Sequence, residues 1–422
     1  MTDLSLGVDL GTSGIRSAVL DAEGRVISMA RAEYGNDTGS AETWWDGASR
    51  CILNQLSALR AGGIDQDRVR RIGVDGTSGS MVLTDEALKP VTRPLLYNAS
   101  GFLEEAQNID AVAPASHITR GPGSALARAL RLLSEDGAER AQHLLHQADF
   151  IAARLMGYGG LSDHNNALKT GFDPEAGGWP DWFAAFGRLS DILPDVRPAG
   201  IRAGPIHPEI AEQLGLSKHV QVHLGTTDSI AAFLASAPMQ IGMAVTSLGT
   251  TLAVKIMSDH RIDVPEIGLY SHKLGNSWLV GGASNTGGGV LLELFTTAQL
   301  EELSTKVDPT KLTTLDYYPL SKPGERFPVN DPNFAPRIEP RPESDVDFLH
   351  GLLDGIARIE AQCYAEISKR GAPRIDRLFT AGGGAKNPTW TKLRERRLGL
   401  KIEIAERTEA AIGTARLISQ AT

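Results

Sequence analysis

The sequence predicts an α/β protein of two domains, and three observations support this class. The chain has 422 residues, which is long enough for two hydrophobic cores. Short apolar runs that end in Gly-Thr turns alternate with stretches of helical periodicity, the longest over residues 345–370. Two similar tetrapeptides, Leu10-Gly11-Thr12-Ser13 and Leu248-Gly249-Thr250-Thr251, stand near the head of each half. We therefore expect one domain over residues 1–236 and a related one over 237–422.

The composition argues against several classes of binding partner and structural site. The formal net charge is −9 and no basic block occurs, which argues against nucleic acid as the principal partner. The only cysteines, Cys51 and Cys363, lie far apart, so a disulfide framework or a structural zinc site is not expected. No apolar run has the length of a membrane span, and the chain opens directly on a predicted strand. We expect a cytoplasmic protein with no membrane partner.

The first element is a hairpin over residues 4–20, in which an apolar strand ends at Asp9 and turns through Gly11 and Gly14. Glycines allow a tight turn whose backbone N–H groups can face an anion, and Thr12 and Ser13 add hydroxyl donors. A carboxylate beside bound phosphate is tolerable when a metal ion neutralises it. Taken alone, such a hairpin is more often a plain turn with a capping aspartate.

The rest of the first half repeats this pattern. A strand over residues 71–75 ends at Asp75 and runs into a turn that contains Thr77. A strand over residues 220–224 precedes Asp228, which stands at the start of a helix, where a negative charge is stabilised or simply caps the helix. Helices are predicted over three further stretches, residues 43–60, 124–135 and 140–156.

The second half opens on the strand and turn that contain Gly249 and Thr250. A strand over residues 278–280 leads into a glycine-rich turn that includes Gly287, and a helix begins near residue 290. After the long helix, a strand over residues 378–381 precedes a second glycine-rich turn with Gly383 and Gly384. Such turns let the backbone approach a flat ligand closely. A short strand over residues 401–404 and a helix from residue 409 complete the chain.

Several nucleotide-binding and catalytic motifs are absent from the sequence. It contains no GxxxxGK[ST] segment and no GxGxxG between a strand and a helix. The protein-kinase motifs, HExxH and GxSxG are absent as well, and the histidines are scattered. What is left is two Gly-Thr hairpins, a glycine turn near the C-terminus and aspartates at three strand ends.

In this combination and order, the motifs resemble those of the FGGY family of carbohydrate kinases, in the actin-like ATPase superfamily. Residues 7–14 resemble the first phosphate motif of the family, and residues 247–250 resemble the second. Residues 381–390 are similar to the adenosine motif, which is the most specific of these segments. Gly225-Thr226-Thr227-Asp228 falls where the family has its catalytic aspartate, and residues 409–415 resemble its closing helix.

The resemblance implies two domains of ribonuclease-H-like topology around an interdomain cleft, each with a five-stranded mixed sheet. It implies transfer of the γ-phosphoryl group of MgATP to a sugar or polyol hydroxyl, so that ATP, Mg²⁺ and a small-molecule sugar are the expected ligands. A monomer or homodimer is expected.

The resemblance also implies roles for individual residues. Asp228 would be the general base, and Asp9 would hold Mg²⁺, with Asp228 as a second metal contact. Asp9, Asp75, Thr77 and Asp228 are the candidate substrate contacts, although a structural role for Asp75 and Thr77 is equally open. The candidate nucleotide contacts are Gly11, Thr12, Ser13, Gly249, Thr250, Gly287, Gly383, Gly384 and Asn387.

The expected substrate is a ketopentose, with D-ribulose first, because the segment from Asp75 to Ser80 resembles the corresponding segment of ribulose kinases. D-xylulose or another polyol is the alternative within the family. A non-kinase ATPase and a sugar-binding pseudo-enzyme are alternatives of other classes. Two departures weaken the assignment of sugar contacts: the chain is short for the family, and Tyr97-Asn98-Ala99 replaces a common Trp-x-Asp.

Overall fold

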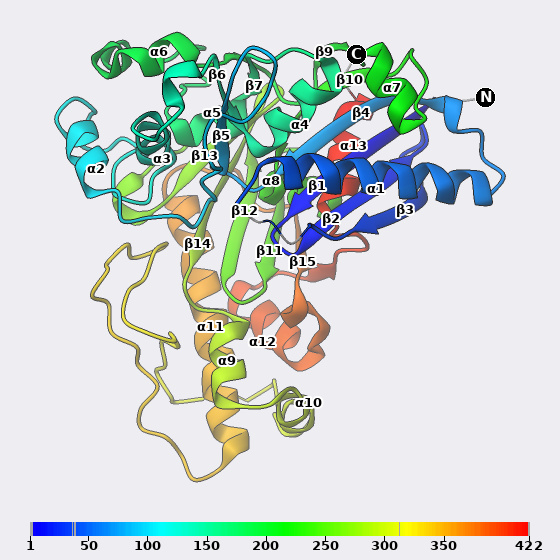
Figure 1. Ribbon diagram of the computed structural model, residues 1–422. Helices are drawn as coiled ribbons and strands as arrows, with labels where there is room; N and C mark the ends of the chain where they lie inside the picture. The colour runs from blue at the N-terminus through cyan, green and yellow to red at the C-terminus, as the bar shows by residue number, and fades with distance from the viewer. Residues whose placement is uncertain (1–2, 36, 38, 312, 421–422) are drawn as a thin grey trace. The chain divides into compact units, whose positions relative to one another are not determined.

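The computed structural model describes residues 3–35, 37, 39–311 and 313–420 (Figure 1). The chain divides into two compact units: Met1–Ala235 together with Glu409–Thr422, and Ser236–Thr408. The first unit is discontinuous in sequence, because the C-terminal segment groups with it and not with the second unit. Helix α13 (Ala410–Gln420) belongs to the first unit, because its residues Ala411, Ile412 and Ala415 are buried in that unit's core.

The first unit is built on a mixed sheet whose strand order is β3-β2-β1-β4-β10-β9. The central strand β1 pairs antiparallel with β2 and parallel with β4, which in turn pairs parallel with β10. The sheet has six strands instead of the expected five, because the short strand β9 pairs with the edge of β10. The strands are β1 (Leu4–Gly11), β2 (Gly14–Leu20), β3 (Val26–Ala32), β4 (Val69–Gly76), β9 (Arg202–Pro205) and β10 (Gln221–Thr227).

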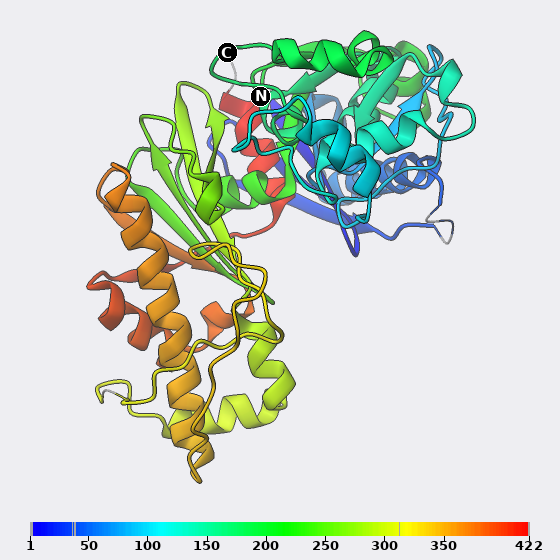
Figure 2. The same cartoon turned by 90° about the vertical axis from the view of Figure 1, so that its left-hand side faces the viewer.

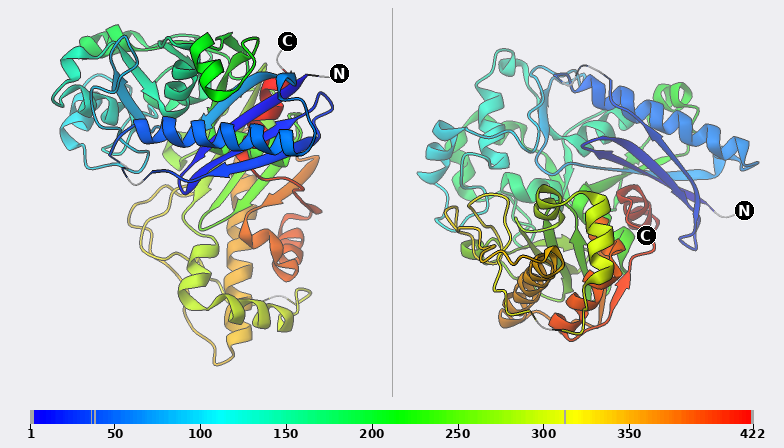
Figure 3. Two further views of the ribbon diagram at one scale, coloured as in Figure 1. Left: turned by 45° about the vertical axis from the view of Figure 1, so that its right-hand side comes forward. Right: turned by 90° about the horizontal axis from the view of Figure 1, so that it is seen from below.

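Helices cover both faces of this sheet. Figures 1 and 3 show α1 (Glu42–Ala61) running alongside β1, β2 and β3, and its apolar side lies in the main core of the unit. On the other face α13 packs against β1 and β4 at two glycines that are paired in register, Gly7 and Gly73. A Cβ atom on Gly7 would lie 2.1 Å from the carbonyl oxygen of Ala411. The glycines therefore let α13 approach the sheet closely.

The remaining elements of the first unit are helices and two small two-stranded sheets. Residues 140–156, predicted as one helix, form the strand β6 (His143–His146) followed by α4 (Gln147–Met156). The helical prediction was wrong over the strand, because β6 pairs with β5 (Met81–Thr84) and this tertiary contact overrides local periodicity. The others are α2 (Leu103–Asp110), α3 (Ala125–Leu133), β7 (Leu161–Asp163), α5 (His164–Thr170), α6 (Arg188–Ile192), β8 (Asp195–Arg197), α7 (Pro208–Leu214), α8 (Asp228–Ser236) and the 3₁₀ helices η1 (Gln66–Arg68), η2 (Ala138–Arg140) and η3 (Asp181–Phe186).

The second unit is built on a sheet whose strand order is β13-β14-β12-β11-β15-β16. Its strand β11 pairs antiparallel with β12 and parallel with β15, as β1 does with β2 and β4. This sheet also has six strands, with β13 as the additional edge strand. The strands are β11 (Met243–Leu248), β12 (Leu252–Ser258), β13 (Tyr270–Leu274), β14 (Ser277–Ser284), β15 (Arg377–Ala381) and β16 (Ile402–Ile404).

A long helix, α11 (Asp345–Lys369), organises the helical layer of the second unit (Figure 2). It packs against α10 (Thr297–Lys306) and α12 (Pro388–Leu398), and the indole of Trp390 donates a hydrogen bond of 3.1 Å to the carbonyl oxygen of Leu353. The other helical segments are α9 (Gly288–Leu294), η4 (Pro265–Ile267) and η5 (Gly383–Lys386). None of the helices within the described residues is long and apolar enough to cross a membrane.

Candidate active site

Two aspartates lie side by side at the ends of parallel strands in the first unit. Asp9 on β1 is in register with Asp75 on β4, and both are buried. The guanidinium of Arg16 approaches Asp9 only to 3.7 Å, from a largely exposed position. Burial raises the pKa of Asp9 to about 6, the hydrogen bond with Asp75 lowers it, and the negative charge of Asp228 raises it again. The positive charge of Arg16 therefore compensates the carboxylates of this pair only in part.

The environment of Asp75 favours its protonated form. Its Oδ2 accepts a hydrogen bond from the hydroxyl of Thr414 on α13, while no donor among the described residues reaches its buried Oδ1. Burial raises the pKa of Asp75 well above its usual range, and the charge of Asp9 adds to the rise. A proton on Asp75 then serves its hydrogen bond to Asp9. Because Asp75 is fully buried, these contacts favour the structural role that the sequence left open.

Asp228 lies at the same end of the sheet. It is the first residue of α8, directly after β10, and its Oδ1 accepts a hydrogen bond of 2.6 Å from the backbone N–H of Ser229. A Cβ on Gly225 would lie 1.6 Å from the carbonyl oxygen of Val74, so only glycine lets β10 come this close to β4 before the helix begins. Asp228 is half-buried, and its charge raises the pKa of Asp9 and of Asp75. The structure thus brings together three of the aspartates that the sequence selected.

Thr77, the other candidate sugar contact, is buried and held by neighbours. Its backbone N–H and its hydroxyl both donate to Oε1 of Gln147, at 2.9 and 2.8 Å, and its hydroxyl lies 2.6 Å from that of Ser80. These bonds fix the turn after β4. The polar groups of Thr77 are therefore hydrogen-bonded within the protein, and no bound ligand is needed to satisfy them.

Sequence reasoning missed three residues that surround this cluster: Arg16, Tyr34 and Gln147. The hydroxyl of Tyr34 donates 2.9 Å to the carbonyl oxygen of Gly11 and also hydrogen-bonds Gln147. Burial and the charge of Asp9 raise the pKa of the Tyr34 phenol above its usual value, so it stays protonated. Tyr34 and Gln147 lie outside every recognisable motif, and no local signal marks them. Arg16 could have been found, because it pairs in register with Asp9 across the hairpin.

The first hairpin presents its hydroxyls outward. Gly11 and Gly14 are paired across the turn between β1 and β2, and the intervening Thr12 and Ser13 are exposed. Gly14 has a φ of +147°, which an L side chain rarely adopts. The predicted phosphate-binding residues of this hairpin are therefore available to a ligand.

In the second unit, two glycine segments are joined by backbone hydrogen bonds. The N–H of Gly288 donates 2.9 Å to the carbonyl oxygen of Gly249, and the N–H of Gly289 donates 3.0 Å to that of Thr250. Gly287 has a φ of +151°, and a Cβ there would lie 2.7 Å from the carbonyl oxygen of Thr250. Around Gly249 the space is open, since its nearest neighbour would be 3.9 Å from an added Cβ.

The third glycine segment adjoins the same hairpin. A Cβ on Gly382 would lie 2.4 Å from the carbonyl oxygen of Leu248. Gly383 has open space around it, whereas a Cβ on Gly384 would lie 2.7 Å from the ring of Trp390. The side chain of Asn387 caps α12 through the N–H of Trp390, at 3.0 Å, and donates 2.8 Å to the hydroxyl of Ser304. Gly383 thus has room for a ligand, while packing and capping account for Gly384 and Asn387.

The carboxylate cluster suits a hard cation in its chemistry. Within the described ranges, no three side chains of His, Cys, Asp or Glu are arranged as a metal site. Mg²⁺ needs fewer protein ligands, because it commonly keeps several waters and binds one or two carboxylates. Asp9 and Asp228 provide such oxygens, and the charge of Asp228 already acts on Asp9. The residues present fit Mg²⁺ that enters with a phosphate ligand.

Comparisons with known proteins find relatives that match over most of the chain. The chain is 26% identical to the xylulose kinase of Lactococcus lactis subsp. lactis (strain IL1403), over 91% of this chain and 80% of that protein. Among solved structures, the ligand-bound xylulose kinase of Lactobacillus acidophilus has a TM-score of 0.83 at 16% identity, covering 99% of this chain and 89% of that chain. The gluconate kinase of the same organism has a TM-score of 0.84 at 16% identity, covering 100% and 89%.

Two family models cover nearly the whole chain. The N-terminal domain model of the FGGY family of carbohydrate kinases matches residues 4–235, and the C-terminal domain model of that family matches residues 244–421. These matches contain all of the aspartates and glycines discussed above. The chain belongs to the FGGY family of carbohydrate kinases.

Proposed function

We propose that the protein transfers the γ-phosphoryl group of MgATP to a hydroxyl of a ketopentose, with Asp228 as the general base. The observation that carries this proposal is the position of Asp228, half-buried at a strand end beside the buried Asp9. Phosphoryl transfer requires in-line positioning, neutralisation of phosphate charge and an acceptor for the hydroxyl proton. The cluster would provide the proton acceptor and a site for Mg²⁺ at one end of one sheet.

The three aspartates would divide the work. Asp228 would accept the proton of the attacking hydroxyl, and the hydrogen bond from Ser229 N–H to its Oδ1 helps to orient the carboxylate. Asp9, with Asp228 as the second contact, would hold Mg²⁺, which supplies charge neutralisation at the phosphates. Asp75 would orient Asp9 through their hydrogen bond instead of touching the sugar.

Backbone and hydroxyl donors would bind the nucleotide. Gly11, Thr12 and Ser13 in the first hairpin, and Gly249, Thr250 and Gly287 in the second unit, are the proposed phosphate contacts. Exposure of Thr12 and Ser13 and the open space around Gly249 support this assignment. Gly383 is the proposed contact to the adenosine, because a flat ligand can approach it closely.

The identity of the sugar is the finer part of the proposal. D-ribulose is the first candidate, on the segment from Asp75 to Ser80. D-xylulose is the second, because the relative that matches over 91% of this chain is a xylulose kinase. The fold alone does not identify the sugar, since a xylulose kinase and a gluconate kinase match it with nearly equal TM-scores.

The test is ADP formation measured with D-ribulose, D-xylulose, hexuloses, gluconate and polyols, for the wild type and Asp228→Ala. We expect sugar-dependent turnover with one ketopentose and its loss in Asp228→Ala. Asp191→Asn on α6, which removes an exposed carboxylate, is the control and should keep full activity. ATP hydrolysis that ignores every sugar and survives Asp228→Ala would contradict the proposal and favour a non-kinase ATPase.

A further inference from the structure

The second unit contains a buried carboxylate that the proposed reaction does not use, Glu325. Its side chain is 3% exposed, and both of its oxygens accept hydrogen bonds from neutral donors. Oε2 accepts from the hydroxyls of Ser284, at 2.6 Å, and Tyr318, at 2.8 Å. Oε1 accepts from the backbone N–H groups of Asn285, at 2.6 Å, and Arg326, at 2.7 Å. A buried carboxylate is costly unless its bonds are made, so this site holds its neighbours firmly.

The residues on either side of Glu325 hydrogen-bond the side chain of Asn285. The side-chain amide of Asn285 donates 2.9 Å to the carbonyl oxygen of Gly324, and its Oδ1 accepts 2.7 Å from Nε of Arg326. One residue further, the N–H of Phe327 donates 3.2 Å to the carbonyl oxygen of Ala283. The segment 324–327 therefore fixes the end of β14 through both its backbone and its side chains.

From this point, hydrogen bonds lead directly to the second hairpin. The hydroxyl of Ser284 donates to Glu325 and accepts 3.1 Å from the N–H of Thr286. The carbonyl oxygen of Thr286 in turn accepts 2.7 Å from the N–H of Leu252, at the base of the hairpin. The next residues, 287–289, hold the carbonyl groups of Gly249 and Thr250, as described above. Glu325 is thus connected to the proposed phosphate contacts through Ser284 and Thr286.

We propose that Glu325 is a positioning residue for the phosphoryl donor: it holds the turn 285–289, and this turn sets the backbone of the Gly249–Thr250 hairpin. The inference rests on the proposed function, since it assumes that this hairpin binds the phosphates of ATP. Backbone donors bind and stabilise phosphate best when their orientation is fixed beforehand. Loss of Glu325 leaves two hydroxyls and two backbone N–H groups without their acceptor, and the turn loses its fixed geometry.

Two substitutions separate shape from charge. In Glu325→Gln, the amide oxygen can accept from the N–H groups of Asn285 and Arg326, while the NH₂ group donates to the hydroxyls of Ser284 and Tyr318, which also accept. We expect this variant to keep a KM for ATP within about threefold of the wild type. Glu325→Ala removes all four bonds and should raise the KM for ATP and the Kd of MgADP by about tenfold or more, with the KM for the sugar unchanged.

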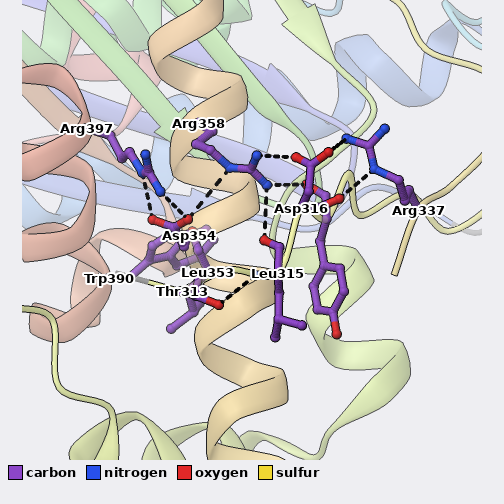
Figure 4. Close-up of polar contacts among 10 residues, drawn as sticks. Thr313, Leu315, Asp316, Arg337, Leu353, Asp354, Arg358, Trp390 and Arg397 are labelled. Carbon is purple, nitrogen blue, oxygen red and sulfur yellow. Dashed lines mark hydrogen bonds and ion pairs between the residues drawn. The ribbon is translucent and has the colours of Figure 1, made fainter. Parts of the chain in front are cut away.

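Asp354→Asn is the matched control. Asp354 on α11 is also 3% exposed, but its carboxylate binds two arginines, Arg397 at 2.8 and 2.6 Å and Arg358 at 3.7 Å (Figure 4). We expect this variant to lower Tm and to leave the KM for ATP unchanged. If Glu325→Ala does not fold, Ser284→Ala removes only the hydroxyl that links Glu325 to Thr286, leaves the other three bonds of Glu325 in place, and should raise the KM for ATP several-fold.

The outcomes separate the two proposals. A wild type that phosphorylates a sugar, with a KM for ATP that shifts no more in Glu325→Ala or Ser284→Ala than in Asp354→Asn, overturns the positioning role alone. A wild type that binds no ATP overturns the proposed function, and the positioning role with it. A selective rise in the KM for ATP with rescue by Glu325→Gln supports the inference.

Discussion

The two sheets have the same strand pairings around β1 and β11, yet they carry different chemistry at the same place. In the first unit, Asp9 on β1 faces Asp75 on β4, and Asp228 follows β10. In the second unit, Ser247 on β11 faces Ala381 on β15. The first sheet thus gathers charged side chains at this end, and the second gathers glycines whose backbone groups are the proposed nucleotide contacts. If the proposed function holds, the same strand arrangement would position a proton acceptor and a metal ion in one unit and backbone contacts to the nucleotide in the other.

The two regions are also sensitive to different kinds of substitution. Burial and the repulsion between neighbouring carboxylates raise the pKa of Asp9 and of Asp75. The glycine segments hold no such charge, but they depend on close backbone contacts that only glycine permits. The first region should therefore respond to charge removal and to pH, and the second to the addition of a single methyl group.

The largest effect is expected for Asp9→Asn. It removes the proposed Mg²⁺ contact, so kcat should fall by about 100-fold or more. Stability should not fall, because the substitution relieves like-charge repulsion. Thermal unfolding and steady-state kinetics measure the two effects. A variant that loses Tm and keeps kcat would reverse the assignment of Asp9.

The same variant has a pH signature. Because the pKa of Asp9 is raised from 3.8 to about 6 in the folded state, the folded protein binds more protons than the unfolded chain in this range. Wild-type stability should therefore decline as pH rises from about 4 to about 6. Asp9→Asn should flatten this part of the Tm profile. An equal decline in both proteins would show that Asp9 is not the group responsible.

A pair of glycine substitutions probes the second region. Gly384→Ala places a methyl group 2.7 Å from Trp390 and should destabilise the unit by about 1–3 kcal/mol. Gly383→Ala meets open space, so its Tm should stay near that of the wild type while the KM for ATP rises several-fold. Chemical denaturation and kinetics compare the two. Equal effects on stability and on the KM for ATP in both variants would contradict the assignment of Gly384 to packing and of Gly383 to ligand contact.

The smallest effect is expected for Thr77→Val. This nearly isosteric change removes the hydroxyl that bonds Gln147 and Ser80, and it should cost about 1 kcal/mol of stability. The KM for the sugar should change less than threefold, because the contacts of Thr77 are internal. A rise of tenfold or more in the sugar KM with unchanged stability would restore Thr77 as a substrate contact.

Local sequence patterns were sufficient to find the hairpins, the glycine turns and the aspartates at strand ends. Each of these depends on a few neighbouring residues: a positive φ at Gly14 or Gly287, or a carboxylate at the end of an apolar run. The strands β1, β4 and β11 and the helix α11 were predicted for the same reason, since their periodicity is long and clear.

What the sequence did not reveal depends on contacts between distant residues. The burial of Asp75 follows from Thr414 on the C-terminal helix, and the role of Glu325 follows from Ser284 and Asn285. Gln147 meets Thr77 only because β6 and α4 fold back onto β5 and β4. Likewise, α13 joins the first unit because Gly7 and Gly73 leave room for it. No short motif encodes such pairings.

The most direct test of the division between the two regions is kcat of Asp228→Asn at saturating ATP and ketopentose. Asparagine keeps the shape of the side chain and cannot accept the hydroxyl proton. A general base typically contributes about 10²–10⁴-fold to the rate, so we predict a fall in kcat of that size. The KM for ATP should change far less than kcat, because Asp228 is only the second proposed Mg²⁺ contact and the proposed phosphate and adenosine contacts are made elsewhere. A kcat within tenfold of the wild type would contradict the assignment of the base to Asp228.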